Sequence, residues 1–374
     1  MPAAGSPVRA AGVLTLEQAM RETFDVPLAA LTTLRLGGPA KRVVEATTED
    51  ELVAAVRDAD ERGEPVLLVG GGSNLVVADS GFDGTVVRVA TRGVEADTSA
   101  SCDSGALAAC GGILVSAAAG ESWDDLVAYA VDQEWSGIEA LSGIPGLVGA
   151  TPMQNVGAYG QEVAQTIWQV RTYDRQDRRI RTFANADCRF AYRDSRFKGS
   201  DRYVILSVSY QLREGDLGAP VAYPELARRL DVAVGERARL ADVRPAVLAL
   251  RAGKGMVLDA DDHDTWSAGS FFTNPLLDDA QVAALPAAAP RFPAAGGRVK
   301  TSAAWLIQHA GFDRGYAGRF DDVSLSTKHT LALTNRGDGT TTELLELARE
   351  VRDGVRATFG VTLVPEPTLV GCAL

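Results

Sequence analysis

Along this chain, segments with apolar residues at helical spacing alternate with short runs in which every residue is apolar. Thr48 and Glu51 form a capping box, and apolar residues at helical spacing follow it. This pattern predicts an amphipathic helix that Gly63 and Pro65 end. The next residues, 66–69, are all apolar and predict a short buried strand.

The same alternation predicts elements along the rest of the chain. We expect strands at 85–89, 331–333 and 361–364, several short strands within 166–212, and helices at 122–133, at 243–252 and from the capping box 340–343 to Gly360. Helices and strands therefore mix throughout, and a glycine-rich loop at 70–74 follows the first buried strand. A shift in composition after residue 254 predicts a domain boundary there.

Composition narrows the class of protein. The chain has 374 residues, 46% of them hydrophobic and 23% charged, which is typical of a globular protein with two or three domains. The formal net charge of -12 argues against binding to nucleic acid or an anionic membrane, but a few local cations could still hold an anionic substrate. No apolar run reaches the roughly 18–20 residues of a membrane helix. Residues 1–12 lack the apolar core of a signal peptide, so we expect a mobile tail and a cytoplasmic protein.

Cysteine and histidine positions give no sign of a metal site. The four cysteines are Cys102, Cys110, Cys188 and Cys372. They form no Cys-x-x-Cys pair, which fits a reducing compartment and does not fit zinc. The three histidines are scattered, at His263, His309 and His329. We therefore expect no metal.

Two glycine-rich loops are candidates for ligand binding. Loop 70–74 could cradle a phosphate with its backbone N–H groups, although it matches neither a P-loop nor the G-x-G-x-x-G pattern. A tight turn without a ligand is the alternative. Loop 144–160 carries Gln154, Asn155 and Tyr159, and its amides could bond a heterocycle or a ribose. An ordered loop without a ligand remains equally open.

Four single residues could carry chemistry. Arg193, among aromatic and charged neighbours, could grip a carboxylate or phosphate, or could form a surface pair with an aspartate. Glu366 lies between two prolines, which suits either a positioned acid or a rigid exposed turn. Ser270 has small residues before it and two aromatics after it, which could exclude water. His329 precedes an apolar run, which favours a structural role or a substrate contact over metal binding.

Taken in order, several segments resemble the UDP-N-acetylenolpyruvoylglucosamine reductases (the MurB family), flavoenzymes of bacterial cell-wall precursor synthesis. The resemblance covers almost the whole chain from Leu31 onward and rests on segments 33–40, 70–74, 144–160, 192–198, 267–275 and 365–367. The first thirty residues and the Ala/Pro-rich stretch before Gly297 lie outside it. Segment 314–323 also departs from it, because it contains charged residues where many relatives have glycine and alanine.

The resemblance implies an α+β protein with a vanillyl-alcohol-oxidase-type (PCMH-type) FAD-binding fold of two subdomains and a smaller α+β substrate-binding domain. The implied division is an N-terminal extension at 1–30, an FAD-binding domain at 31–254 (subdomains about 31–90 and 91–254), a substrate-binding domain at 255–365, and a C-terminal segment at 366–374 that returns to the FAD domain. The implied reaction is the NADPH-dependent reduction of UDP-N-acetylglucosamine enolpyruvate to UDP-N-acetylmuramate through FAD. NADPH would reduce the flavin first, and the sugar nucleotide would then enter the same site.

The resemblance also implies a role for each matching residue. Arg193 and Glu366 would polarise the substrate carboxylate, and Ser270 would give a proton to the carbanion-like intermediate. The implied cofactor contacts are Gly70, Gly71, Gly72, Ser73, Asn74, Ile144, Pro145, Gly149, Ala150, Gly157 and Tyr159. The implied substrate contacts are Tyr223, Lys254, Asn274, Lys300 and His329. We expect a monomer that binds neither nucleic acid nor membrane.

Two other functions remain open from the sequence. A different flavin oxidase or dehydrogenase could use the same scaffold, often with FAD tethered through histidine. The first histidine is His263, so the FAD-binding part offers none and non-covalent FAD is expected, but Cys102 and Cys110 stay open as tethers. A non-catalytic nucleotide-binding module is the third possibility, and it would not bleach on addition of NADPH.

Overall fold

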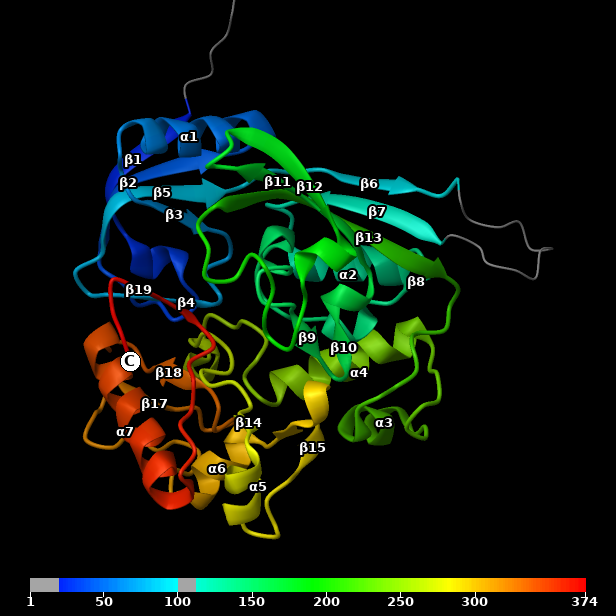
Figure 1. The fold of residues 1–374 in the computed structure, drawn as a ribbon, viewed down its shortest axis with the longest axis vertical. Coiled ribbons are helices and arrows are strands. Elements are labelled where there is room, and N and C mark those ends of the chain that lie inside the picture. Colours follow the sequence, from blue (N-terminus) through cyan, green and yellow to red (C-terminus); the bar gives the residue numbers. More distant parts are fainter. Residues whose placement is uncertain (1–19, 100–111) are drawn as a thin grey trace, which may run out of the picture.

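The computed structural model of the chain describes residues 20–99 and 112–374. Two sheets make up one half of the molecule, and most helices and small sheets of the later sequence make up the other half (Figure 1). The helices are α1 Glu49–Glu61, α2 Trp123–Asp132, α3 Pro224–Leu230, α4 Leu240–Ala252, α5 Asp279–Ala284, α6 Ala303–His309 and α7 Thr341–Phe359.

The first sheet has four strands in the order β1-β2-β5-β3. Their bounds are β1 Arg21–Pro27, β2 Pro39–Ala46, β3 Val66–Val69 and β5 Phe82–Val89. β1 is antiparallel to β2, while β5 runs parallel to both β2 and β3. Strand β1 lies within the segment 1–30 that we expected to be an extension, and its pairing with β2 makes it part of this sheet. The division into domains itself stays a prediction.

The second sheet is antiparallel and has the order β12-β11-β13-β7-β6, with β8 also paired to β13. Its strands are β6 Val94–Asp97, β7 Ile113–Ala118, β8 Trp135–Ser136, β11 Ile167–Asp174, β12 Arg179–Ala184 and β13 Tyr203–Glu214. One face packs on α2 through Trp123 and Leu126. The opposite face contributes Tyr173 and Leu206 to a core shared with α1, so this helix joins the two sheets.

The later sequence builds a third core around α7. Its apolar stripe, predicted from the capping box at Thr340, packs with Phe271 and Phe272. Two small sheets belong to this part of the chain. The first has three strands, β14 Leu276–Leu277, β16 Val299–Lys300 and β15 Phe292–Pro293, and the second has two, β17 Val323–Leu325 and β18 Leu333–Asn335. Helices α3 and α4 form a separate small core, and a short hairpin of β9 Gly157–Ala158 and β10 Gln161–Glu162 lies in the long glycine-rich loop.

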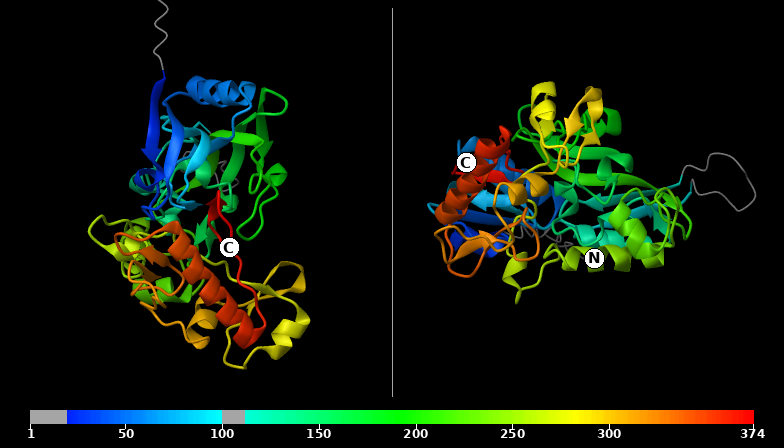
Figure 2. Two further views of the ribbon diagram at one scale, coloured as in Figure 1. Left: turned by 90° about the vertical axis from the view of Figure 1, so that its left-hand side faces the viewer. Right: turned by 90° about the horizontal axis from the view of Figure 1, so that it is seen from below.

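The end of the chain returns to the first glycine-rich loop. After α7 the chain runs back towards the sheets, as the red segment in Figure 2 shows. Strand β19 Thr368–Val370 pairs in parallel with β4 Leu75–Val77, and Thr368 N donates to Asn74 O at 2.9 Å. This pairing brings Glu366 beside loop 70–74.

Two predicted strands were wrong in their position. Residues 361–364 are extended but form no strand; the nearby pairing is a single bridge between Phe272 and Pro365. The run 331–333 contributes only Leu333 to β18, because Ala332 N turns back to His329 O. No helix in the described part of the chain is long and apolar enough to cross a membrane.

Candidate active site

Loop 70–74 packs so closely on its neighbours that side chains would not fit. A Cβ on Gly71 would lie 2.8 Å from Gly146 Cα, and a Cβ on Gly72 would lie 1.9 Å from Leu31 O. Gly72 also has a φ of 61°, which glycine adopts at little cost. The loop is held to its neighbour at one further point, where Ser73 Oγ donates to Pro145 O at 3.0 Å.

The same loop offers a row of free donors. Within residues 20–99 and 112–374, no acceptor meets the backbone N–H groups of Gly71, Gly72, Ser73 and Asn74. Successive N–H groups of this kind form an anion-binding concavity. The geometry therefore suits the phosphate-binding role that we predicted for this loop.

A cavity of about 500 Å³ adjoins the loop. Gly70 and Gly71 line it together with Thr33, Arg35 and Trp266. The Arg35 guanidinium stacks on the indole, with Cζ 3.9 Å from the ring centroid. No local sequence pattern points to Arg35 or Trp266 as site residues, because only the fold brings them to the glycines.

Arg193 is fixed in an unusual conformation. Its φ of 52° lies in the left-handed region, inside a tight turn closed by hydrogen bonds between Ala191 and Asp194. The guanidinium donates through Nη2 to Gly157 O at 2.7 Å and through Nη1 to Asn155 O at 3.4 Å. Gly157, which we expected to contact the cofactor, therefore positions Arg193. A strained backbone with a fully anchored side chain is common at functional sites.

Glu366 lies directly against Arg193. The distance from Glu366 Oε1 to Arg193 Nε is 3.0 Å, but the N–H is not aimed at the carboxylate, so the pair is an ionic contact without that hydrogen bond. The Glu366 N–H donates to Phe271 O at 2.8 Å, which fixes the backbone. Burial raises the pKa of Glu366, and the nearby cations Arg193 and Lys198 reduce this effect without cancelling it.

Gln154 links Glu366 to the glycine-rich loop. Its Nε2 donates to Glu366 Oε1 at 3.1 Å, and its Oε1 accepts from Asn74 Nδ2 at 3.2 Å. From sequence, Gln154 was only one of the amides of the long loop, and we predicted no site role for it. Its contacts span 80 and 212 positions of the chain, so local pattern could not reveal them.

Ser270 lies next to this group of residues. It directly precedes Phe271, whose carbonyl accepts the Glu366 N–H and whose own N–H donates to Leu331 O at 2.7 Å. The Ser270 side chain is partly buried, and its hydroxyl has no hydrogen-bond partner among the described residues. The hydroxyl is therefore available to a ligand.

Asn274 and Lys300 meet at Tyr192, the neighbour of Arg193. The Lys300 Nζ lies 4.2 Å from the Tyr192 ring centroid, and Asn274 lies close enough to the Tyr192 hydroxyl to lower its pKa against the effect of burial. Burial raises the pKa of Tyr192 and lowers the pKa of Lys300. Asn274 Oδ1 also accepts from Ala303 N at 2.9 Å, so it holds the start of α6.

Lys254, Tyr223 and Tyr159 form a second group at the far side of the long loop. The two tyrosine rings pack edge to face at 5.5 Å, and Lys254 Nζ lies 5.7 Å from the Tyr159 ring centroid. Lys254 also pairs with Glu225 at the start of α3. Burial raises the pKa of Tyr159 to about 12. Tyr159, which we expected to contact the cofactor, thus lies with two predicted substrate residues.

His329 belongs to the same second group. Burial, together with the nearby cations Lys254 and Arg314, lowers its pKa to about 4. Arg251, which the sequence analysis did not select, is buried beside Tyr159, and its Nη2 donates to Met256 O at 2.8 Å. A buried neutral imidazole next to cations suits a site for an anionic group.

The other predicted cofactor residues have structural contacts. The N–H groups of Gly149 and Ala150 donate to Ala119 O and Leu147 O at 2.9 and 3.0 Å, so neither is free for a ligand. Ile144 packs against the core below the second sheet. Cys102 and Cys110 lie outside the described residues. Within the described ranges, no group of three or more His, Cys, Asp or Glu side chains is placed to hold a metal.

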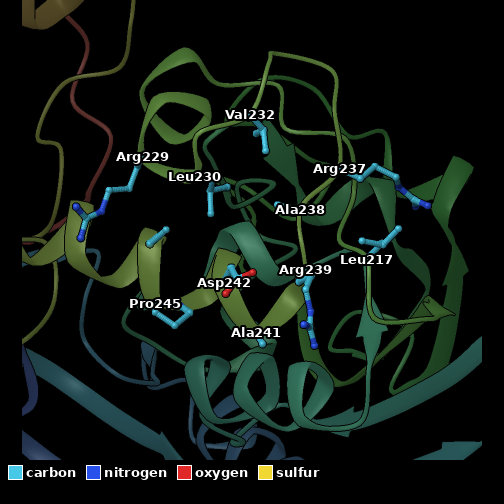
Figure 3. A pocket seen from close by; sticks show the side chains of 11 residues that line it. Leu217, Arg229, Leu230, Val232, Arg237, Ala238, Arg239, Ala241, Asp242 and Pro245 are labelled. Atoms are coloured by element: carbon cyan, nitrogen blue, oxygen red, sulfur yellow. The ribbon is translucent and has the colours of Figure 1, made fainter.

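A second cavity of about 540 Å³ lies beside α3 and α4, and none of the predicted site residues lines it (Figure 3). Its arginines are Arg229, Arg237 and Arg239, and Figure 3 shows them pointing in different directions. They do not converge on one point, so this cavity does not resemble an anion site.

Comparisons with known proteins agree with this geometry. Residues 40–182 match the family described as FAD binding domain, and residues 261–370 match UDP-N-acetylenolpyruvoylglucosamine reductase, C-terminal domain. The free N–H groups of loop 70–74 fall within the first match, and they fit the pyrophosphate of FAD. The chain therefore carries an FAD-binding domain.

Whole-chain relatives extend the match. The UDP-N-acetylenolpyruvoylglucosamine reductase of Cutibacterium acnes is 59% identical over 352 residues, covering 94% of this chain and 90% of the relative. The one from Streptomyces coelicolor is 55% identical, covering 96% and 93%.

A solved structure gives the fold. The UDP-N-acetylenolpyruvylglucosamine reductase (MurB) of Thermus caldophilus superposes with a TM-score of 0.62 at 23% identity, covering 94% of this chain and 98% of that one. The expected fold class is thereby confirmed. From the relatives' identity and coverage, the chain belongs to the UDP-N-acetylenolpyruvoylglucosamine reductase family.

Proposed function

We propose that this protein uses NADPH and non-covalently bound FAD to reduce UDP-N-acetylglucosamine enolpyruvate to UDP-N-acetylmuramate in peptidoglycan precursor synthesis. Family membership supports the substrate and the reaction type. The observation that carries the proposal is the partly buried contact of Arg193 with Glu366 at 3.0 Å. Reduction of an enolpyruvyl group places negative charge on its carboxylate, and this pair can stabilise it.

Loop 70–74 and its neighbours would hold the cofactor. Its free N–H groups suit the pyrophosphate, and the adjoining cavity beside Trp266 offers room for another part of the dinucleotide. When bound, FAD supplies the hydride-transfer chemistry that no protein side chain provides. The protein's own residues would orient the substrate, stabilise the negative charge that develops on it and supply its proton.

Arg193 and Glu366 would stabilise the charge that develops on the substrate. Hydride addition at the vinyl terminal carbon drives electron density through the α-carbon into the carboxylate. Arg193 is a fixed cation, anchored by Gly157 O. Glu366 can donate a hydrogen bond only when it is neutral, and its raised pKa favours that form.

Ser270 would supply the proton that completes the reduction. Its hydroxyl is free and lies one residue from the segment that binds the Glu366 backbone. Serine is a weak acid, but the carbon that receives the proton is also weakly acidic once protonated, so the transfer is feasible.

The second group of residues would hold the nucleotide part of the substrate. Lys254 lies near both the His329 imidazole and the Tyr159 ring, and a lysine is a common phosphate ligand. Tyr159 would belong to this group because its ring packs on Tyr223. Asn274 and Lys300 would act nearer Arg193, since both contact Tyr192.

We also propose that the protein works as a monomer in the cytoplasm. The absence of Cys-x-x-Cys pairs suits a reducing compartment. Size-exclusion chromatography with light scattering tests whether the protein is a monomer, and cell fractionation tests whether it is in the cytoplasm.

Product analysis tests the function. Purified protein with NADPH and the enolpyruvyl sugar nucleotide should yield a product that has gained two hydrogens, with a lactyl methyl signal in its proton spectrum. Absence of this product in the presence of bound FAD would contradict the proposal. Acid precipitation should leave a colourless pellet and a yellow supernatant; a yellow pellet would show covalent FAD.

A further inference from the structure

Three side chains from distant parts of the chain form one line of hydrogen bonds. Asn74 donates to Gln154 Oε1, and Gln154 donates to Glu366 Oε1, at 3.2 and 3.1 Å. We propose that Gln154, oriented by Asn74, is a positioning residue that determines which oxygen of Glu366 carries its proton and so donates a hydrogen bond to the substrate. This inference rests on the function proposed above, because it concerns how Glu366 acts there.

The direction of the line is set at its Arg193 end. Glu366 Oε1 lies 3.0 Å from Arg193 Nε, and a guanidinium can only donate. A proton on Oε1 would lie against this cation, so Oε1 is the accepting oxygen. Gln154 must then present its NH₂ group to Glu366, which leaves its carbonyl oxygen for Asn74. Every contact in the structure has this polarity.

The proton of neutral Glu366 therefore belongs on Oε2. Among the described residues, Oε2 has no hydrogen-bond partner, so it is the oxygen that remains for the substrate carboxylate. The charged or titratable groups that face Glu366 are Arg193, Lys198 and Tyr192. Lys198 Nζ donates to Arg193 O at 2.7 Å, so Lys198 does not replace Gln154 as the donor to Glu366.

Replacing the donor at position 74 by an acceptor tests the series of hydrogen bonds from Asn74 through Gln154 to Glu366. In Asn74→Asp, the carboxylate can only accept, so Gln154 should turn its NH₂ group towards position 74 and its oxygen towards Glu366. We expect substrate-driven flavin reoxidation, normalised to bound FAD, to slow roughly ten- to hundredfold, since a hydrogen bond to an ionisable group is lost.

A double-mutant cycle separates this effect from damage to cofactor binding. Gln154→Leu breaks the line, and Gln154→Met, which keeps the side-chain length, is measured in parallel in case the first variant folds poorly. If Asn74 acts through Gln154, adding Asn74→Asp to either variant should cause no further loss. Losses that multiply would overturn the proposal.

Infrared spectroscopy provides a readout that needs no substrate. The protonated Glu366 carboxyl should give a C=O band that Glu366→Gln removes. That carbonyl is Oε1, so Gln154→Leu should move the band to higher frequency by removing the hydrogen bond that Gln154 donates to it. An unmoved band, or no such band in the unchanged protein, would overturn the proposal. The band remains measurable if product analysis shows that the proposed reaction is wrong, so the two failures are distinguishable.

Discussion

The Arg193 guanidinium and the Glu366 carboxyl share one partly enclosed space, with Nε and Oε1 3.0 Å apart. The two residues come from a tight turn and from a Pro-Glu-Pro segment separated by most of the later sequence. Each is held by backbone contacts of its own: Arg193 by Gly157 O, and Glu366 by Phe271 O. The fold therefore fixes a permanent cation against an acid whose pKa burial raises.

Replacing the Arg193 guanidinium by an ammonium group should slow the reduction of the substrate. In Arg193→Lys, one ammonium group cannot donate to Gly157 O and Asn155 O while facing Glu366. We expect flavin reoxidation by substrate to slow by roughly a hundredfold. Arg196→Lys is the matched control, because Arg196 lies in the same loop but stacks on Phe183 at 4.3 Å. Equal losses in both variants would count against the role of Arg193.

Ser270→Ala should separate the two half-reactions. Removing the hydroxyl takes away the proton donor, so reoxidation by substrate should slow by at least about a hundredfold, while reduction by NADPH changes little. Ser267→Ala is the control, since that hydroxyl only accepts from Gly269 N at 3.2 Å. Stopped-flow absorbance measures both steps. Similar losses in both half-reactions would show that Ser270 is not the proton donor.

The raised pKa of Glu366 predicts how rate and stability depend on pH. The neutral acid is the active form, so the substrate step should slow as pH rises through the raised folded pKa. The folded state also holds this proton more tightly than the unfolded state, in which the pKa is near 4.5. The contribution of Glu366 to the free energy of unfolding should therefore be complete below that value and be lost as pH rises through the folded pKa. Glu366→Gln should abolish both trends; persistence of either would contradict the assignment.

His329 should show the opposite trend. Its folded pKa of about 4 lies below the ordinary 6.5, so the fold favours the neutral ring. Stability from this residue is complete above pH 6.5 and is lost as pH falls towards 4. Urea denaturation at constant excess FAD measures it. His329→Gln should reduce the slope of the unfolding free energy against pH in this range. His309→Gln, at the exposed end of α6, should leave the slope unchanged. Identical slopes in the two variants and the unchanged protein would contradict burial of a neutral His329 ring.

Gly72→Ala should damage both the fold and FAD binding. Its new Cβ would lie 1.9 Å from Leu31 O at a φ of 61°. Gly63→Ala is the control, because Gly63 has a similar φ of 68° but nothing within 4 Å of a new Cβ. We expect the control to cost about 1–2 kcal/mol of unfolding free energy from backbone strain alone. Gly72→Ala should cost more and should purify with less flavin, as absorbance will measure; an equal cost would mean that the loop is not tightly packed.

The local sequence pattern predicted the elements that depend on their own residues. The run 66–69 and the capping boxes at Thr48 and Thr340 appear as predicted, because hydrophobic spacing and caps act locally. Residues 361–364 alternate between buried and exposed as a strand would, but no partner strand lies beside them. Partners of this kind depend on tertiary structure, which single-sequence pattern does not contain.

The functional site depends even more strongly on tertiary contacts that local sequence pattern does not reveal. Arg193, Ser270 and Glu366 could be named from the resemblance, and the structure brings Glu366 against Arg193 and beside the segment that follows Ser270. The role of Gln154 could not be named, because a glutamine in a polar loop has no distinctive pattern until Asn74 and Glu366 are placed around it.

The most direct test of the whole account is an anaerobic pair of half-reactions on the purified flavoprotein. NADPH should bleach the flavin absorbance, and the enolpyruvyl sugar nucleotide added next should restore it. Restoration by the substrate without oxygen is the result that the account predicts. Flavin that NADPH bleaches but the sugar nucleotide leaves colourless would contradict the proposed substrate, and flavin that NADPH does not bleach would contradict the proposed enzyme.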